Sequence, residues 1–346
     1  MAGLTTIQTS GEPGADAAEV FIRGKATWGD ASPLIQVDGV ERSMNDIDPN
    51  EIESISILKD ASATAVFGVR GANGVILITT KRGREGKAHI SFGTSASIQM
   101  PTKMVETANS YEYAMFYNQM MANDTPAGEK PVKTFSDGVI QKFRDGSDPI
   151  RFPSINWIDY IMGDATLQSQ HNLNISGGTD KVRYFISAGA YTQGGLFNEF
   201  SLPYGISYQY RRFNYRSNLD IDVTKTTTIS FNVAGNVNSS EKPRTSQGSS
   251  GMVKNIYYST PFRSAGFVND KLVYTTTDSQ SDGLNLPFVG DADPFTYYGG
   301  GAAHSINNSL NADLILNQKL DFITKGLSFK LKGSYLSLIH ISEPTR

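Results

Sequence analysis

The chain has 346 residues, a modest hydrophobic content of 39% and a formal net charge of −3, so neither nucleic acid nor an anionic membrane surface is favoured as a partner. It contains no cysteine, which excludes disulfides, thiolate metal sites and cysteine nucleophiles. No stretch approaches the roughly 20 apolar residues of a membrane-spanning helix, whereas a transmembrane barrel stays possible because its strands present only alternate side chains to lipid. The sequence does not open on a basic segment followed by an apolar core, so we expect the true N-terminus to lie upstream.

The first part of the chain, residues 1–85, has the mixed pattern of a small α/β unit. Short apolar runs that close on glycine predict strands at residues 20–24 and 33–39. A helix start is expected at Asp48, which can cap, because a proline follows at the first helical position and Glu51 stands where a capping box places its acid. The isoleucines that come next would supply core.

The end of this unit combines another short helix with a buried strand. Residues 61–67 predict the helix, and Gly68 can end it. After a glycine-rich turn, residues 75–80 are apolar on both faces, which is typical of a strand covered on both sides.

From residue 89 onward the pattern changes to a strict alternation of apolar and polar side chains. Seven segments show it, at residues 89–100, 172–176, 182–190, 212–223, 229–237, 310–317 and 327–335. We expect strands of roughly ten residues or more, long enough to cross a bilayer at a tilt, whereas strands of soluble sandwiches more often have about 5–6 residues. One polar face carries Arg212, Arg216, Asp220 and Asp222, which fits a water-filled lumen better than a half-exposed sheet.

The connections between these segments alternate in length. Tight turns are expected at residues 177–181, 223–226 and 321–326, and long loops at residues 101–167, 192–207 and 239–305. Short turns on one side and long loops on the other are typical of outer-membrane barrels, in which the short turns are periplasmic. The first long loop predicts a helix at residues 110–121, whose aromatic and methionine side chains we expect to pack on the loop body.

Residue types that could support catalysis or metal binding do not form a convincing pattern. The candidate carboxylates have ordinary roles as helix caps and turn residues: Asp38, Asp48, Glu51, Glu53 and Asp60. The four histidines share no metal-ligand spacing: His89, His171, His304 and His340. The glycine-rich segment 68–74 precedes a strand rather than opening a helix, which argues against a phosphate loop. We therefore expect no catalytic residue, no metal and no cofactor.

Several ordered segments resemble the SusC/RagA family of TonB-dependent transporters. Those similar to the plug signature are residues 33–40, 48–68 and 70–83, with residues 10–14 and 21–24 similar to the plug entrance. Residues 156–159 and 172–178 resemble the first extracellular loop and the second barrel strand. Together these segments are long and specific, and the resemblance covers residues 1–336.

This resemblance implies a mixed α/β plug domain (1–85) followed by a partial antiparallel transmembrane β-barrel (86–336), with about seven strands of an expected 22. It further implies a protein of the cell outer membrane of Bacteroidota-type bacteria that imports glycan or peptide fragments. The expected partners are a SusD-like surface lipoprotein and the TonB–ExbB–ExbD complex, which pulls on a Ton box to open the plug. Outer-membrane lipid would surround the barrel.

The chain departs from the family pattern at both ends. A signal peptide, a Ton box and the small N-terminal extension domain are missing, and an open sheet edge cannot persist in lipid, so we expect a fragment that cannot transport by itself. Residues 337–346 resemble a translated sequencing adapter, and a non-native tail is expected there, although the strand alternation continues through them. Alternatives are a siderophore or cobalamin receptor of the same architecture and a glycan-binding β protein without a transport role.

Two groups of site residues follow from the expected plug. Charged plug residues inside a barrel must find partners, so Arg23, Arg70 and Lys81 are expected to contact the lumen wall near Arg212 and Asp220.

The second group lies on the loop after the first predicted plug strand. Its candidate ligand contacts are Lys25, Thr27, Trp28 and Asp30. An aromatic ring beside polar groups could stack on a sugar or pack on a peptide, since loops often carry function. Equally, Trp28 could serve to anchor the loop.

Overall fold

The computed structural model describes residues 4–8, 10–15, 17–22, 24, 31–60, 64–198, 200, 208–244, 248–275, 284–287, 292–296 and 301–345. Its N-terminal unit contains a four-stranded sheet in the order β4-β3-β6-β5. These strands are β3 (Leu34–Val37), β4 (Val40–Glu41), β5 (Ile52–Leu58) and β6 (Val75–Thr80). β3 and β6 are parallel, and β1 (Leu4–Ile7) forms a separate antiparallel pair with β2 (Glu19–Ile22).

An apolar core holds the described part of the N-terminal unit together. Its buried members are Val20, Ile22, Val37, Ile47, Ile76 and Ile78. Short 3-10 helices connect the strands: η1 (Met44–Asp46), η2 (Pro49–Glu51) and η3 (Ala65–Gly71). Gly68 interrupts η3 with a φ of 59°, consistent with the break predicted at this glycine.

The helix predicted at Asp48 is wrong beyond its first turn. Asp48 caps as expected, since its Oδ1 accepts from Asn50 N (2.8 Å), but the helical turn ends at Glu51 and β5 follows at once. The physical reason lies in residues 52–58, where three β-branched isoleucines favour extended backbone and β5 pairs with β6.

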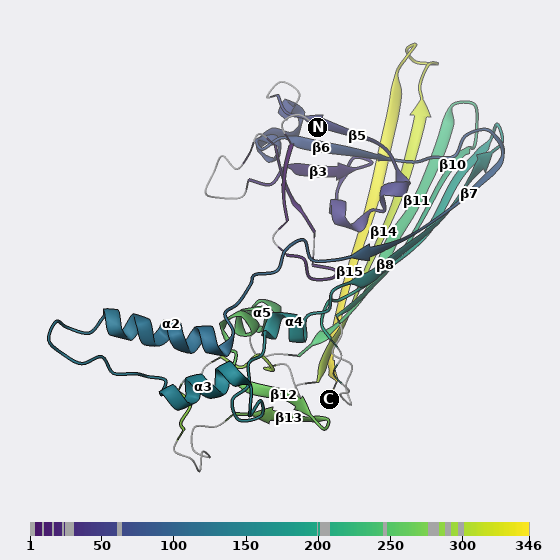
Figure 1. Ribbon diagram of the computed structural model, residues 1–346. Coiled ribbons are helices and arrows are strands. Elements are labelled where there is room, and N and C mark those ends of the chain that lie inside the picture. The colour runs from purple at the N-terminus through teal and green to yellow at the C-terminus, as the bar shows by residue number, and fades with distance from the viewer. Residues whose placement is uncertain are drawn as a thin grey trace.

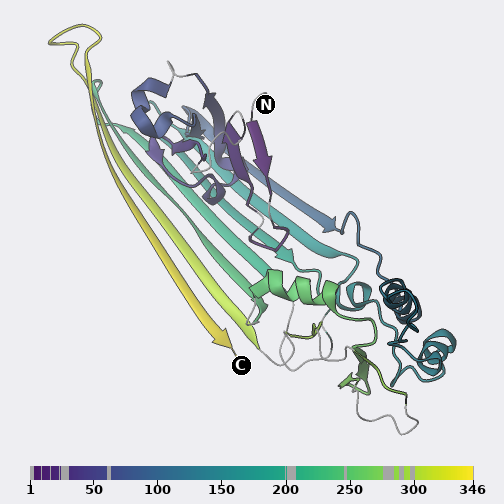
Figure 2. The same cartoon turned by 90° about the vertical axis from the view of Figure 1, so that its left-hand side faces the viewer.

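A seven-stranded antiparallel sheet forms the body of the molecule, in the order β15-β14-β11-β10-β9-β8-β7 (Figures 1 and 2). Its strands are β7 (Gly86–Gln99), β8 (Thr166–Gly178), β9 (Val182–Gly194), β10 (Gln209–Asp222), β11 (Thr227–Pro243), β14 (Ala302–Lys319) and β15 (Ser328–Thr345). All seven predicted strands are confirmed. β15 stays paired with β14 through the tail region, from Ser337 opposite Leu310 to Thr345 opposite Ala302.

The two faces of this sheet have different environments, as the alternation predicted. On β10, Phe213 is 52% exposed on the outer face, whereas its neighbour Asn214 is 4% exposed beneath the N-terminal unit. Exposed apolar side chains continue across the outer face, for example Phe92, Phe231 and Leu314. The N-terminal unit lies against the polar face (Figure 1). In the described part of the chain, no helix has both the length and the apolar character needed to cross a bilayer.

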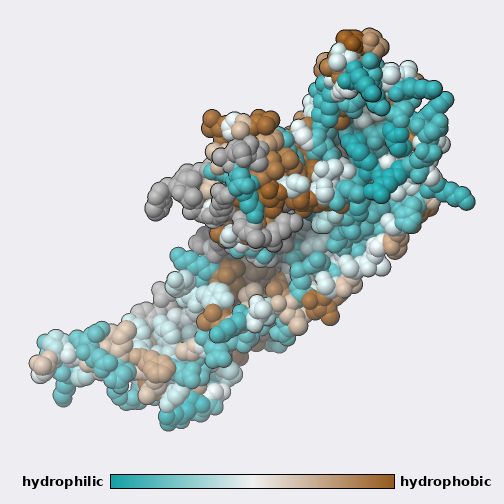
Figure 3. Space-filling view, turned by 90° about the horizontal axis from the view of Figure 1, so that it is seen from above, coloured by the Kyte–Doolittle hydropathy of each residue, from teal (hydrophilic) through white to brown (hydrophobic). Residues whose placement is uncertain are grey.

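Long loops gather at one end of the sheet and short turns at the other, as predicted. The loops carry α2 (Ser110–Asn123), α3 (Asp137–Asp145), α4 (Trp157–Ile161), α5 (Gly248–Tyr258), β12 (Ser264–Val268) and β13 (Lys271–Tyr274). The helix predicted at residues 110–121 is α2, which starts with a capping box between Asn109 and Glu112. Figure 3 shows apolar side chains gathered over the N-terminal unit and a mainly hydrophilic surface along the neighbouring strands.

Candidate functional site

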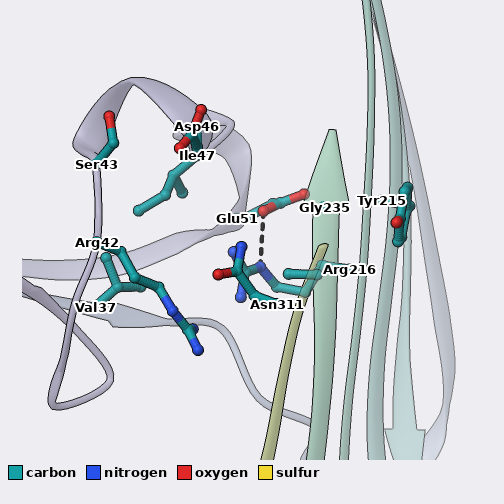
Figure 4. Close-up of a pocket in the computed structure, with 11 residues that line it drawn as sticks. Val37, Arg42, Ser43, Asp46, Ile47, Glu51, Tyr215, Arg216, Gly235 and Asn311 are labelled. Carbon is teal, nitrogen blue, oxygen red and sulfur yellow. Dashed lines mark hydrogen bonds and ion pairs between the residues drawn. The ribbon is translucent and has the colours of Figure 1, made fainter. Parts of the chain in front are cut away.

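A buried ion pair joins the N-terminal unit to the polar face of the long sheet. Arg216 Nε of β10 donates to Glu51 Oε2 at the end of η2 (2.7 Å), and the two side chains are 4% and 2% exposed. Burial raises the pKa of Glu51, although the nearby Arg216 guanidinium acts in the opposite direction. The close-up in Figure 4 shows this pair between the two units. The ion pair fixes the position of η2 along β10.

Asp48 makes a second buried contact next to this pair. Its Oδ2 accepts from Asn214 Nδ2 (3.0 Å), while its Oδ1 caps η2. With its amide oriented to satisfy its neighbours, Asn172 of β8 also donates to Asp48 Oδ2 (3.0 Å). Gly189 of β9 makes room here, because a Cβ at this position would lie 3.1 Å from Asp48 Oδ2. One carboxylate of the N-terminal unit thus forms hydrogen bonds with two strands and lies close to the backbone of a third.

A third set of contacts reaches the strands at the C-terminal side of the sheet. Arg42 Nη2 pairs with Asp313 Oδ1 of β14 (2.5 Å), and the two side chains are 9% and 1% exposed. Lys332 of β15 lies 3.7 Å from Asp313 Oδ2 and donates to the main-chain oxygen of Asp38 (2.6 Å). Two cations therefore offset the buried Asp313 carboxylate.

The linker that follows β6 is itself held against the sheet. Asn218 Nδ2 donates to Thr80 Oγ1 (3.0 Å) and to the main-chain oxygen of Lys81 (2.7 Å). Arg82 Nη1 pairs with Asp220 Oδ1 (2.8 Å). At the next residue, Gly83, a Cβ would lie 2.2 Å from the main-chain nitrogen of Tyr184, so the backbone approaches β9 as closely as only glycine allows.

The packing between the two units is tight beside the Glu51–Arg216 pair. The space left there is a cavity of about 10 Å³. Its lining includes Arg42, Asp46 and Ile47 from the N-terminal unit, and Ala234 and Asn311 from the sheet. The polar contacts therefore operate across a nearly closed interface, where they are stronger than in water.

The charged residues predicted to link the two units fall into three cases. Asp220 contacts the linker through Arg82, and Arg212 Nη1 donates to the main-chain oxygen of Asn45 (3.4 Å). Lys81 Nζ instead donates to the main-chain oxygen of Asn50 (2.8 Å), inside the N-terminal unit.

Arg70 is a correction to the predicted contacts with the lumen wall. It forms an exposed ion pair with Glu41, and both residues belong to the N-terminal unit. The physical reason is that the Arg70 side chain is 69% exposed, so it keeps its charge in solvent and does not need a buried partner on the sheet. The remaining charged candidate, Arg23, lies outside the described residues.

A much larger cavity, of about 780 Å³, opens between the N-terminal unit and the loop end of the sheet. Residues 10–13 of the β1–β2 connection form one side, and the loop-end residues of β7, β8, β9 and β11 form another. Side chains from the long loops complete it, including Met162, Phe197 and Val253. We call this space the large cavity. Its volume is in the range of ligand-binding cavities in general.

The polar groups of the large cavity come from both units. Lys242 Nζ of β11 lies 3.4 Å from Glu12 Oε1, which comes from the β1–β2 connection. Across β7, β8 and β9, Gln193 donates to Gln99 (3.0 Å) and Gln99 donates to Gln168 (2.5 Å). A second cavity of about 190 Å³ shares the Glu12–Lys242 pair. The pair therefore lies between two cavities.

Gly14 sets the position of the β1–β2 connection against the sheet. Its φ is 77°, and a Cβ would lie 2.2 Å from a ring carbon of Tyr210 on β10. The left-handed backbone and the close approach both require glycine at this position. The loop that borders the large cavity is thus placed by direct packing on the wall.

Sequence reasoning missed the cavity-lining residues. The predicted ligand contacts Lys25, Thr27, Trp28 and Asp30 lie outside the described residues. A local signal did exist for the loop at residues 10–14, where two glycines and a proline indicate a defined turn. By contrast, the lining glutamines and Lys242 lie on polar strand faces that look alike along the whole sheet.

Comparisons with known proteins agree with this architecture. The TonB-dependent Receptor Plug Domain matches residues 1–75. TonB-dependent receptor P3 of Formosa agariphila is 32% identical over 284 residues, which are 81% of this chain and 25% of that receptor. TonB-dependent receptor SusC of Bacteroides thetaiotaomicron is 29% identical over 231 residues, 63% of this chain and 20% of SusC.

A solved structure supplies the matching fold. The RagAB peptide transporter superposes with a TM-score of 0.70 at 22% identity, covering 98% of this chain and 38% of that one. The chain belongs to the SusC/RagA-type TonB-dependent receptors. The N-terminal unit is therefore the plug, and the seven-stranded sheet is part of the barrel wall. The chain spans 22% and 25% of two curated receptors that it matches.

Proposed function

We propose that this receptor imports a nutrient, a glycan or a peptide fragment, across the bacterial outer membrane by opening its plug under force from TonB. The observation that carries the proposal is the plug seated on the polar face of the barrel wall, with the large cavity on the loop side of it. Cargo would bind in the large cavity, and the plug would bar its way to the short-turn side. Movement of the plug would then let the cargo pass to the short-turn side.

The polar contacts between plug and wall suit a gate better than a permanent seal. A dry apolar interface would lose hydrophobic stabilisation over its whole area on opening. Ion pairs and amide hydrogen bonds, such as Glu51–Arg216 and Asp48–Asn214, can exchange their partners for water as the lumen opens. The closed state is thus specific without being irreversible.

The partners in this proposal follow from the family. A SusD-like lipoprotein would cover the loop end, and the TonB–ExbB–ExbD complex would supply force from the short-turn side through an N-terminal Ton box. The receptor would lie in the outer membrane with the exposed apolar face of the strands toward lipid, where Phe92, Phe213 and Phe231 are exposed. Asp48 and Glu51 then hold the plug in place, and we assign them no catalytic step.

A siderophore or cobalamin receptor of the same architecture is the main alternative, and the lining of the large cavity favours the nutrient proposal. Capture of an anionic iron chelate calls for a cluster of cations. Among the described lining residues, Lys242 is the cation, and Glu12 offsets it.

Uptake by whole cells tests the proposal. Cells with the native receptor should accumulate labelled oligosaccharide or oligopeptide, and the accumulation should stop when TonB is deleted or the proton gradient is collapsed. A receptor-deletion strain provides the baseline. Uptake that persists without TonB, or that requires only a ferric siderophore, would contradict the proposal.

A further inference from the structure

We propose that the outer face of the barrel wall binds the phosphate group of an acylated lipid through Arg211 and His171. The site is a group of polar side chains on neighbouring strands, which we call the outer polar patch: Thr94, Ser169, His171, Thr192 and Arg211. The plug lies on the opposite face of the sheet, and no described element covers this one (Figures 1 and 2). The proposal goes beyond import and takes from it only that this face meets lipid.

The strand register places the first row of the patch on the outer face. Side chains alternate between the two faces along a strand, and directly opposite residues of paired strands share a face. Arg212 donates to the plug, so Arg211 projects outward together with the exposed Phe213. Thr192 of β9 is opposite Arg211, and Ser169 of β8 is opposite Thr192. One cation and two hydroxyls therefore lie side by side across three strands.

The second row of the patch contains a histidine. His171 of β8 is opposite Thr94 of β7, and it shares the outer face with the exposed Leu173. Thr94 Oγ1 and His171 Nδ1 are 2.8 Å apart. When the hydroxyl donates to Nδ1, the proton of the imidazole is on Nε2, which can donate to a ligand. Among the described residues, Nε2 has no hydrogen-bond partner.

Apolar side chains border the patch on both sides along β7 and β8. Toward the loops, Ile98 and Leu167 are opposite each other and are 65% and 71% exposed. Toward the short turns, Phe92 and Leu173 form the corresponding pair. A polar margin at the membrane edge would continue toward the loops, whereas here apolar side chains return. An ionisable residue in such surroundings calls for a polar partner from the membrane itself.

The level of the patch matches the headgroups of the outer leaflet. Arg211 is the third residue of β10, and Asp222 is the last residue, at the short-turn end. At ~3.4 Å per residue and a tilt of about 40°, Arg211 lies roughly 28 Å above the short turns, just beyond the ~25 Å apolar band of a barrel. A lipid phosphate can therefore reach Arg211 while the acyl chains lie on Phe213 below.

Arg211 has a hydrogen-bond partner but no counter-ion within the described part of the chain. Its Nη2 donates to the amide oxygen of Gln209 (2.9 Å), and it takes part in none of the ion pairs there. Glu241 of β11 is opposite Gln209 rather than Arg211. A guanidinium can bind two oxygens of one phosphate, and the hydroxyls of Ser169 and Thr192, 2.7 Å apart, offer further donors beside it.

Native mass spectrometry of the full-length receptor, purified in detergent and stripped of lipid, tests the proposal. The probes are dioleoyl phosphatidic acid and dioleoylglycerol, which share their acyl chains, with inorganic phosphate as the competitor. Phosphatidic acid should bind about tenfold more tightly than dioleoylglycerol, because charge-assisted contacts to its phosphate are gained. Equal affinity for the two lipids would overturn the proposal. Displacement of phosphatidic acid by an equal concentration of inorganic phosphate would show a site for free phosphate and would also overturn it.

Variants assign the phosphate to the patch. Arg211→Met should weaken phosphatidic acid about tenfold and leave dioleoylglycerol unchanged, and Arg211→Lys should retain part of the affinity because its point charge remains. His171→Leu should weaken phosphatidic acid about threefold. Glu241→Gln removes a nearby negative charge and should tighten binding. The control Arg84→Met removes an exposed cation of the plug and should change neither affinity. Equal losses in Arg84→Met and Arg211→Met would refute the site.

Failure of this proposal is separable from failure of the import proposal. A receptor that binds both lipids equally, in cells whose uptake still depends on TonB, would overturn the lipid site and leave import standing. Uptake that does not depend on TonB would overturn import, whatever the lipid measurements show.

Discussion

Replacing Arg216 by methionine should loosen the plug more than any exposed charge substitution. The change leaves the Glu51 carboxylate buried at 2% exposure without its cation, and burial already raises its pKa. Breaking a buried pair in this way costs about 3–5 kcal/mol. With a denaturant dependence of about 1 kcal/mol per molar urea, the urea concentration at which the plug leaves the sheet should fall by about 3–5 M.

Pore opening reports this loss directly. The native receptor and the Arg216→Met variant would be inserted in planar bilayers and their conductance followed as urea is raised. The control is Arg84→Met, which breaks the exposed Arg84–Glu53 pair, 84% and 45% exposed, and should leave the midpoint nearly unchanged. A double Glu51→Met/Arg216→Met variant should recover most of the loss, because no buried charge remains. Equal midpoints for Arg216→Met and Arg84→Met would refute the reasoning.

The pH dependence of the same midpoint has a definite sign. Because the pKa of Glu51 is raised in the seated plug, its protonation stabilises the seated state fully below the ordinary glutamate value, and this stabilisation is lost as the pH rises through the raised value. The amount by which Arg216→Met lowers the urea midpoint should therefore shrink as the pH falls from neutral. Glu51→Gln should remove this part of the pH dependence, and an unchanged profile would contradict the assignment to Glu51.

Three further changes test other parts of the structure. Gly83→Ala should displace the linker from the Tyr184 backbone, destabilise plug binding to the sheet by about 1–3 kcal/mol and so lower the urea midpoint for pore opening, whereas an unchanged midpoint would show that the approach is not tight. Trp157→Phe removes the bond from its ring nitrogen to the Thr260 oxygen (2.8 Å), and hydrogen exchange in the loop region should reveal a loss of about 1–3 kcal/mol. Asn109→Ala should fray the first turn of α2 by about 1 kcal/mol in the same measurement, and full protection there would contradict the cap.

The barrel strands could be predicted from sequence because each of their faces has one fixed environment. Phe213 and Asn214 are neighbours in the chain, yet one is exposed to the outside and the other lies under the plug, and this contrast repeats along β10. The loop helix α3 also had local signals, a Ser136 cap and a left-handed Gly146 at its end, but its polar sequence conceals its two buried residues. The alternation of apolar and polar residues was sufficient to predict the barrel strands, but it did not predict the loop helix α3.

The site residues could not be predicted because their partners are distant in sequence. Glu51 has the spacing of a capping-box acid, and only the fold reveals that its carboxylate pairs with Arg216, 165 residues away. Arg42 and Asp313 are separated by 271 residues. Local chemistry indicated that charges inside a barrel must be paired, but it could not say which strand supplies each partner.

The placement of β1 has a mechanical consequence for the closed receptor. β1 pairs only with β2 among the described strands, through four residues whose side chains are mostly exposed, whereas the rest of the plug is held by buried ion pairs on several wall strands. Tension applied at the N-terminal end would therefore peel β1 away first. Residues 10–13 lie in the connection after β1 and border the large cavity, so the cargo would lose its contacts with this connection before the plug leaves the wall.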